Sequence, residues 1–262
     1  MKWMRFLHAG QAGFGTAQGD AVRVYQGDMF NAPQPTGQVL PLAEVQWLPP
    51  VPPPRLVLGL WNNFRASAAK NGWAEPAEPL YFLKSPGCVV AHDAPIPVPD
   101  PAVYDGRVVY EGELALVIGR TTRAVSEAQA PAHIFGVTLA NDVTAMELLH
   151  RDASFTAWTR AKSFDGFCPL GPVIATDFAI CQTSALRTLV GGRERQNYLL
   201  SDMFFSLAAV VSHISRSLTL EAGDVILCGT SLGVLPMKPG TRVEVVVDGI
   251  GTLANTYGPA AA

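Results

Sequence analysis

The stretch YEGELALVIG, residues 110–119, begins with two glutamates separated by a glycine and continues as an uninterrupted apolar run. The wider segment 108–119 is rich in β-branched residues and predicts a strand. Side chains two positions apart in a strand project from the same face, so Glu111 and Glu113 are expected to point the same way. The apolar residues that follow lie on both faces. We therefore predict a strand that is buried on both sides beyond its carboxylates.

Two like charges held side by side at the start of an apolar strand repel each other and lose hydration. A divalent cation would remove both penalties, and oxygen ligands suit Mg²⁺ or Mn²⁺, with Ca²⁺ also possible. Asp142 ends another strand-like segment, IFGVTLAND (134–142), and is a candidate third ligand. Glu111 and Glu113 also fit two glutamates simply exposed at a strand end, and spacing alone leaves both interpretations open.

Further strands are predicted along the rest of the chain, at RLVLGL (55–60), LYFLK (80–84), DVILCGT (224–230) and TRVEVVVDG (241–249). The clearest predicted helix runs from Ser201 to Ser217, with Ser201 as its N-cap and an apolar stripe along one face. Strands outnumber helices and do not alternate with them regularly. The expected fold class is therefore α+β and β-rich, arranged as a mixed β-roll.

The N-terminal part of the chain reads as a separate unit. Residues 1–46 hold short strand-like runs between glycine-rich turns, and LPPVPPPR (48–55) contains five prolines. A proline-rich segment is extended and stiff, which is typical of a linker. We expect a small β-rich domain with its linker over 1–50 and a metal-dependent catalytic domain over 51–262.

Composition narrows the class of protein. Charged residues make up 16 % and hydrophobic residues 48 %, which indicates either an unusually large core or surface buried between subunits. We expect a homodimer. A net charge of −3 without basic runs argues against nucleic-acid binding, and no apolar stretch is long enough to span a membrane. The four cysteines form no C-x-x-C pair and the five histidines no zinc-type spacing, which indicates reduced thiols and a cytoplasmic protein.

Several motifs occur together in a recognisable order. YEGELALVIG is followed by LAND (139–142), RAKSFDGFCPLGP (160–172), GDVILCGT (223–230) and LAN (253–255). Over roughly residues 55–256 this series resembles the fumarylacetoacetate hydrolase family. The segment KSFDGFCPLG is most similar to the branch of isomerases and decarboxylases that process homoprotocatechuate ring-cleavage products. The resemblance implies the β-roll of this family, preceded by the small N-terminal β domain.

The resemblance also implies roles for single residues. Glu111, Glu113 and Asp142 would hold the metal, and Lys162 would be catalytic, stabilising an enolate or moving a proton if its pKa is depressed. The remaining matches imply contacts with substrate. They are Thr230 in CGT, Gln196 after the turn GGRERQ, and Lys84 in LYFLKSP.

One departure from the family pattern concerns the lid. Hydrolases of this family typically carry N-Y-x-x-H-x-x-E, in which the histidine and glutamate activate the attacking water. Here Ser67 stands at the histidine position and Lys70 at the glutamate position, and neither can serve as that base. Decarboxylation and keto–enol isomerisation need no activated water. Arg65 and Lys70 on such a lid would instead suit an anionic substrate.

The expected function is therefore a divalent-metal-dependent decarboxylase or isomerase of 2-oxo, oxo-dicarboxylic acids in the catabolism of aromatic compounds. The alternatives are a fumarylacetoacetate- or acylpyruvate-type C–C hydrolase that uses a different base, such as His92 or His150, and oxaloacetate decarboxylation. A catalytically silent member that keeps the fold is the remaining alternative. The expected partner is a small oxo acid.

Overall fold

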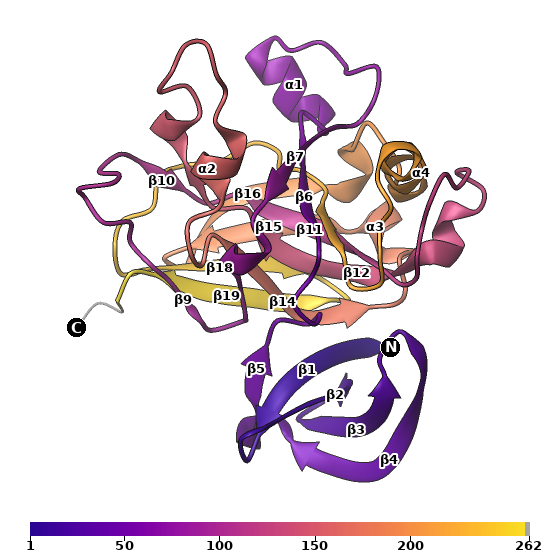
Figure 1. Cartoon of the computed structure of the whole chain (residues 1–262). Helices are drawn as coiled ribbons and strands as arrows, with labels where there is room; N and C mark the ends of the chain where they lie inside the picture. Colours follow the sequence, from indigo (N-terminus) through magenta and orange to yellow (C-terminus); the bar gives the residue numbers. More distant parts are fainter. Residues whose placement is uncertain (260–262) are drawn as a thin grey trace.

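The computed structural model describes residues 1–259, and residues 260–262, the end of the expected 51–262 segment, lie outside the described residues. The fold is strand-rich with few helices, which confirms the expected β-rich α+β class (Figure 1). The largest sheet follows the order β4-β3-β2-β1-β14-β12-β11-β17-β6-β7, with β5 paired to β1 and β8 to β14. Its twelve strands are β1 (Lys2–His8), β2 (Gln11–Gln18), β3 (Ala21–Asp28), β4 (Asn31–Pro41), β5 (Gln46–Leu48), β6 (Val57–Trp61), β7 (Leu80–Lys84), β8 (Val89–Val90), β11 (Gly112–Ile118), β12 (Ile134–Asn141), β14 (Cys168–Ala175) and β17 (Val225–Leu227).

Two smaller sheets complete the strands. A two-stranded ladder joins β10 (Val108–Val109) to β13 (Thr144–Ala145). The third sheet, in the order β16-β15-β18-β19-β9, comprises β9 (Pro95–Ile96), β15 (Ala185–Val190), β16 (Arg193–Leu199), β18 (Thr241–Val247) and β19 (Gly251–Tyr257). The α-helices are α1 (Arg65–Asn71), α2 (Trp158–Lys162), α3 (Ile180–Thr183) and α4 (Leu207–Ser217). Five 3₁₀ turns connect these elements, namely η1 (Leu42–Glu44), η2 (Pro86–Cys88), η3 (Ala130–His133), η4 (Met146–Leu148) and η5 (Leu200–Asp202).

The first five strands lie together at one end of the molecule, as Figure 1 shows in indigo and violet. They are continuous with the main sheet, because β1 pairs with β14 at Lys2↔Ala175 and Trp3↔Ile174. The proline-rich segment that follows is fastened to them, since the Arg5 guanidinium donates to the carbonyl of Val51 over 2.8 Å. A domain boundary at residue 50 stays a prediction.

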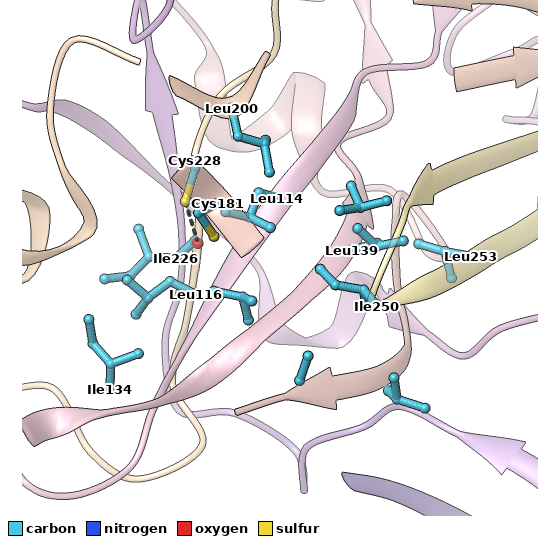
Figure 2. Packing of buried hydrophobic residues seen from close by; sticks show 14 of the residues in the cluster. Leu114, Leu116, Ile134, Leu139, Cys181, Leu200, Ile226, Cys228, Ile250 and Leu253 are labelled. Carbon is cyan, nitrogen blue, oxygen red and sulfur yellow. Dashed lines mark hydrogen bonds between the residues drawn. The ribbon is translucent and has the colours of Figure 1, made fainter. Parts of the chain in front are cut away.

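Strand β11 lies in the middle of the core, and all seven of its residues are buried. Leu114 and Leu116 face one apolar cluster, while Ala115 and Val117 face a second one on the other side of the strand. Figure 2 shows the first cluster, in which side chains from several other segments pack around Leu114 and Leu116, among them Ile134, Leu139, Ile226, Ile250 and Leu253. The prediction of a strand buried on both faces is confirmed.

Two expected elements are shorter in the structure than the sequence indicated. The segment 108–119 is not one strand, because β10 pairs with β13 while β11 begins only at Gly112 and pairs with β12. The helix expected from Ser201 begins at Leu207 instead. Ser206 is its N-cap and accepts a hydrogen bond from the Ala209 amide over 3.1 Å. The preceding residues form η5, and the carbonyls of residues 202 and 203 accept hydrogen bonds from Arg65.

Within residues 1–259, no helix has the length and apolar character needed to cross a membrane.

Candidate functional site

The three carboxylates predicted as metal ligands lie together. Strands β11 and β12 are antiparallel with Gly112 opposite Asn141, so the start of one strand meets the end of the other. The Asp142 amide donates to the Glu111 carbonyl over 2.8 Å, which joins the two segments just beyond the ladder. One oxygen from each of Glu111, Glu113 and Asp142 lies within 4.8 Å of the others. Since Glu111 precedes the strand, this convergence comes from the paired strand ends and not from alternation along one continuous strand.

Burial makes this cluster costly without a cation. Glu113 and Asp142 are each 1 % exposed. Burial, followed by repulsion from Asp142 and Glu111, raises the pKa of Glu113 well above its ordinary value. Among the described residues Glu113 receives one hydrogen bond, from the Gly229 amide over 2.7 Å. Gly229 has φ +86°, a conformation that favours glycine, and this places its amide on the carboxylate. Three oxygen donors in these surroundings fit a divalent cation.

Two lysines hold Asp142 between them. Lys162, at the end of α2, places its Nζ 2.9 Å from Glu111 Oε2 and 2.5 Å from Asp142 Oδ2. Lys84, at the end of β7, places its Nζ 2.6 Å from Asp142 Oδ1 and donates to the Phe167 carbonyl over 3.0 Å. Burial raises the pKa of Asp142, but attraction to Lys162 and Lys84 outweighs it and holds this pKa below its ordinary value. Asp142 is therefore an ionised and tightly oriented carboxylate.

The two lysines differ in what they can reach. Lys162 lines a cavity of about 420 Å³ beside Glu111, whereas Lys84 is 1 % exposed and does not line it. Burial lowers the pKa of Lys162, but Asp142 and Glu111 outweigh it and leave this pKa raised above its ordinary value. Lys162 is thus a stable ammonium group among these neighbours. Proton transfer by Lys162 was expected only if its pKa were depressed, and the raised pKa does not meet that condition. Lys84 contacts Asp142 and Phe167, and its contact with substrate stays a prediction.

Thr230 and Gln196 form a hydrogen-bonded unit with the first residue of β11. The Gln196 side chain donates to Thr230 Oγ1 over 2.9 Å, and Thr230 Oγ1 donates to the Gly112 carbonyl over 2.9 Å. The Gly112 amide donates to Gln196 Oε1 over 3.0 Å. Thr230 lines the cavity, but Gln196 does not and is 1 % exposed. Gln196 therefore positions Thr230 and β11 and does not face the cavity as expected.

Helix α1 covers the cavity and carries the departure from the hydrolase pattern. Ser67 and Lys70, together with Asn71, line the cavity. Arg65 does not. Its guanidinium donates to the carbonyls of residues 202 and 203 and stacks over the Phe204 ring at 5.0 Å. In this structure Arg65 fastens α1 to the segment before α4, and its contact with substrate stays a prediction.

The two histidines considered as replacement bases lie outside this cavity. His92 packs against Trp47 at 5.2 Å and its Nδ1 accepts the Ala254 amide. His150 lines a neighbouring hollow that shares six lining residues with the cavity, namely Trp61, Trp73, Phe82, Met146, Leu149 and Trp158.

Several cavity residues were not anticipated from the sequence. Ser231 Oγ and Asn62 Oδ1 are buried without a hydrogen-bond partner among the described residues, and both residues line the cavity. Ser231 directly follows Thr230 of the CGT motif, and this adjacency is the feature of the sequence that could have identified Ser231. The apolar part of the lining comes from residues far apart in the chain, including Leu60, Trp61, Trp73, Phe82, Met146, Leu149 and Trp158.

The segment that brings Met146 and Leu149 to the cavity is anchored by Glu147. Arg107 Nε lies 2.6 Å from Glu147 Oε1, and its amide donates to Glu147 Oε2 over 2.9 Å. The Tyr104 hydroxyl donates to the same Oε2 atom. Burial works against ionisation of Glu147, but these hydrogen bonds outweigh it and lower its pKa to about 2.

Comparison with known proteins identifies the family. Residues 57–257 match the family described as "Fumarylacetoacetate (FAA) hydrolase C-terminal", and residues 1–50 match "Rv2993c-like, N-terminal". Protein Rv2993c of Mycobacterium tuberculosis is 40 % identical, over 86 % of this chain and 83 % of its own length. Oxaloacetate tautomerase YisK of Bacillus subtilis is 35 % identical, over 83 % of this chain and 74 % of its own length.

A solved structure shares both the fold and the sequence pattern. The crystal structure of 2-hydroxyhepta-2,4-diene-1,7-dioate isomerase from Mycobacterium marinum superposes with a TM-score of 0.88 at 36 % identity, covering 98 % of each chain. The resemblance drawn from the ordered motifs is thereby confirmed. This chain is an enzyme of the fumarylacetoacetate hydrolase family.

Proposed function

We propose that this enzyme requires a divalent cation and forms enolates of 2-oxo acids, which it decarboxylates or isomerises. One observation carries the proposal. A buried cluster of three carboxylates and the Lys162 ammonium meets a cavity whose covering helix presents Ser67 and Lys70. This arrangement can stabilise negative charge on a bound oxo acid but offers no acid–base pair on the lid.

Glu111, Glu113 and Asp142 would hold Mg²⁺ or Mn²⁺, with Ca²⁺ as a further candidate. With all three carboxylates and both lysines ionised, the cluster has a formal charge of −1, since three negative and two positive groups are present. A divalent cation would favour the ionised form of Glu113, whose pKa is raised in its absence, and would offset the charge of the three carboxylates. When bound, it would supply Lewis-acid polarisation of the carbonyl and carboxylate oxygens of a 2-oxo acid.

The protein's own groups then act on the substrate. Loss of CO₂ from a carboxylate on C3, or of a C3 proton to water, would leave an electron pair that delocalises onto the 2-oxo oxygen, and the Lys162 ammonium would donate a hydrogen bond to that oxygen. Thr230, locked by Gln196, and the unpartnered Ser231 hydroxyl border the same cavity and would hold the substrate carboxylate. Protonation of C3 by water would complete either reaction.

Hydrolysis of a C–C bond is the competing function. It needs a base that activates water, and Ser67 and Lys70 supply none. His150 is the group that favours this alternative, because its hollow adjoins the cavity along Trp61 and Trp158. Replacement of His150 by Phe should leave CO₂ release and enolate formation unchanged while abolishing any acylpyruvate cleavage.

The decisive experiment is a substrate panel. Metal-loaded enzyme is mixed with 2-oxo acids and acylpyruvates, and CO₂ release, enolate absorbance and acylpyruvate cleavage are followed in parallel. The proposal expects turnover of 2-oxo acids that disappears with a chelator and returns with Mn²⁺. Efficient acylpyruvate cleavage without enolate chemistry on any 2-oxo acid would overturn it.

We further propose a cytoplasmic homodimer. The four cysteines are free and buried, which suits a reducing compartment. Sedimentation of the purified protein tests the dimer directly.

A further inference from the structure

Three tryptophans from separate parts of the chain form one wall of the cavity. Trp61 ends β6, Trp73 follows α1, and Trp158 begins α2. The ring centroids of Trp61 and Trp73 are 4.9 Å apart, and those of Trp61 and Trp158 are 6.3 Å apart. We call these three residues the tryptophan wall. They line the same cavity as Glu111 and Lys162.

Phe82 fixes the end of this wall beside the charged cluster. Its ring stacks on Trp158 at 5.0 Å with an angle of 10° between the planes, and Lys162 Nζ lies 5.2 Å from its centroid. Gly59 makes room for the ring, because a Cβ at residue 59 would come within 2.4 Å of Phe82 Cζ. The aromatic surface of the wall therefore extends through Phe82 to Lys162.

Trp61 and Trp73 lie outside the two apolar clusters of the core, and Trp158 packs against one of them. Trp73 is 41 % exposed, and Trp61 and Trp158 are only partly buried. Aromatic surface left open beside a charged cluster is the usual composition of a ligand site, in which apolar walls surround a few polar groups. The cavity volume of about 420 Å³ is also large. A cavity of about 150 Å³ already accommodates benzene, so this one has room for a 2-oxo acid head group and a ring.

Few cationic side chains line the cavity. Among the described residues that line it, Lys70 is the one cation apart from Lys162, and Lys70 is exposed. An ion pair at such an exposed position changes affinity by about fivefold or less. Arg65, the second cation expected to attract a distal carboxylate, is engaged elsewhere. We therefore expect contact of a flat apolar tail with the tryptophan wall to increase affinity more than an ion pair between Lys70 and a second carboxylate.

We propose that the tryptophan wall binds a flat, uncharged aryl or conjugated tail, so that the substrates are 2-oxo acids carrying a ring-sized apolar group. This inference rests on the proposed function, in which the carboxylate cluster, Lys162 and Thr230 bind the 2-oxo acid head group next to the Phe82 end of the wall. Tails of this kind gain from stacking on tryptophan as well as from burial of apolar area.

The test is calorimetric binding to the Mn²⁺-loaded enzyme. The ligands are oxalate and pyruvate for the head group, 2-oxoglutarate for a carboxylate tail, and 2-oxo-4-phenylbutanoate for an aryl tail. We expect the phenyl compound to bind at least tenfold more tightly than pyruvate and than 2-oxoglutarate. Trp73→Ala and Trp61→Leu should each reduce that preference to about threefold or less while oxalate binding stays unchanged. The matched control is Trp47→Leu, which lies outside the cavity and should change nothing.

The outcomes separate the two proposals. Oxalate binding without any advantage for the phenyl compound overturns the aryl-tail inference and leaves the proposed function standing. Tighter binding of 2-oxoglutarate than of the phenyl compound overturns it in favour of a dicarboxylate. Failure of oxalate and pyruvate to bind in the presence of Mn²⁺ overturns the proposed function itself. A phenyl advantage that survives both Trp73→Ala and Trp61→Leu removes the tryptophan wall as its source.

Discussion

Replacement of Lys84 by Met separates a structural role for this buried lysine from a role in substrate binding. The substitution would leave Asp142 Oδ1 and the Phe167 carbonyl without their donor, at 2.6 Å and 3.0 Å respectively. Breaking a buried ion pair costs about 3–5 kcal/mol. Lys162 stays on the other oxygen of Asp142, so we take the lower end, about 3 kcal/mol of unfolding free energy. At about 2–4 °C per kcal/mol for a chain of this size, Tm should fall by roughly 6–12 °C.

The measurement is urea and thermal unfolding of the metal-free protein, followed by circular dichroism. Lys70→Met is the matched control, because Lys70 is exposed and should stay within about 0.5 kcal/mol of wild type. A Lys84→Met protein within about 1 kcal/mol of wild type whose KM for the best substrate is strongly raised would refute the reasoning. It would show that Lys84 contacts substrate and does not hold Asp142.

Four further predictions follow from the site. Glu113→Gln should weaken Mn²⁺ binding by at least tenfold in calorimetry, and unchanged affinity would remove this residue from the ligand set. Lys162→Met should leave Mn²⁺ affinity nearly intact but lower kcat by about 10²-fold or more in steady-state assays, whereas a change of only a few-fold would make it a bystander. Ser67→His/Lys70→Glu should raise acylpyruvate cleavage above a wild-type kcat/KM that lies below about 10⁴ M⁻¹s⁻¹; efficient cleavage by wild type contradicts this. Glu147→Gln should reduce stability near neutral pH. Because the pKa of Glu147 is lowered to about 2 in the folded protein, its contribution is complete above its ordinary pKa of 4.5 and is lost as pH falls toward 2. The two proteins should therefore unfold alike near pH 2, and a stability difference that is constant between pH 7 and pH 2 would exclude the carboxylate as its cause.

The carboxylate cluster could be anticipated because its residues stand at the ends of two recognisable strands. Two glutamates one residue apart precede an apolar strand, and Asp142 ends another strand, so antiparallel pairing of these two strands brings all three together. The ordered family motifs favoured a metal site over the alternative of two glutamates exposed at a strand end. Local strand propensity also gave one wrong result, a single continuous strand over 108–119. The break at Tyr110 depends on the pairing of β10 with β13, and strand propensity along 108–119 carries no sign of it.

Side chains whose partners are distant in the chain were not predictable in the same way. Arg65 and Lys70 are both cationic residues of α1 and look alike in the sequence. They differ because Arg65 meets the segment before α4, whereas Lys70 lines the cavity. Lys84 matched a family lysine, but its burial against Asp142 depends on the position of β7 at the sheet edge. Trp61 and Trp73 are separated by a whole helix, so no periodicity links them.

The pairing of β11 with β12 has a consequence for the evolution of the chain. The three carboxylates sit at the open end of this hairpin, and the connecting segment, residues 119–133, leaves from the opposite end. Residues 126–129 of this segment are all exposed. Lengthening a flexible connection costs little, about 0.6 kcal/mol for each doubling. Insertions at Glu127–Ala128 should therefore change the spacing between Glu113 and Asp142 in the sequence without moving either carboxylate, and the site can persist while the distance between its motifs drifts.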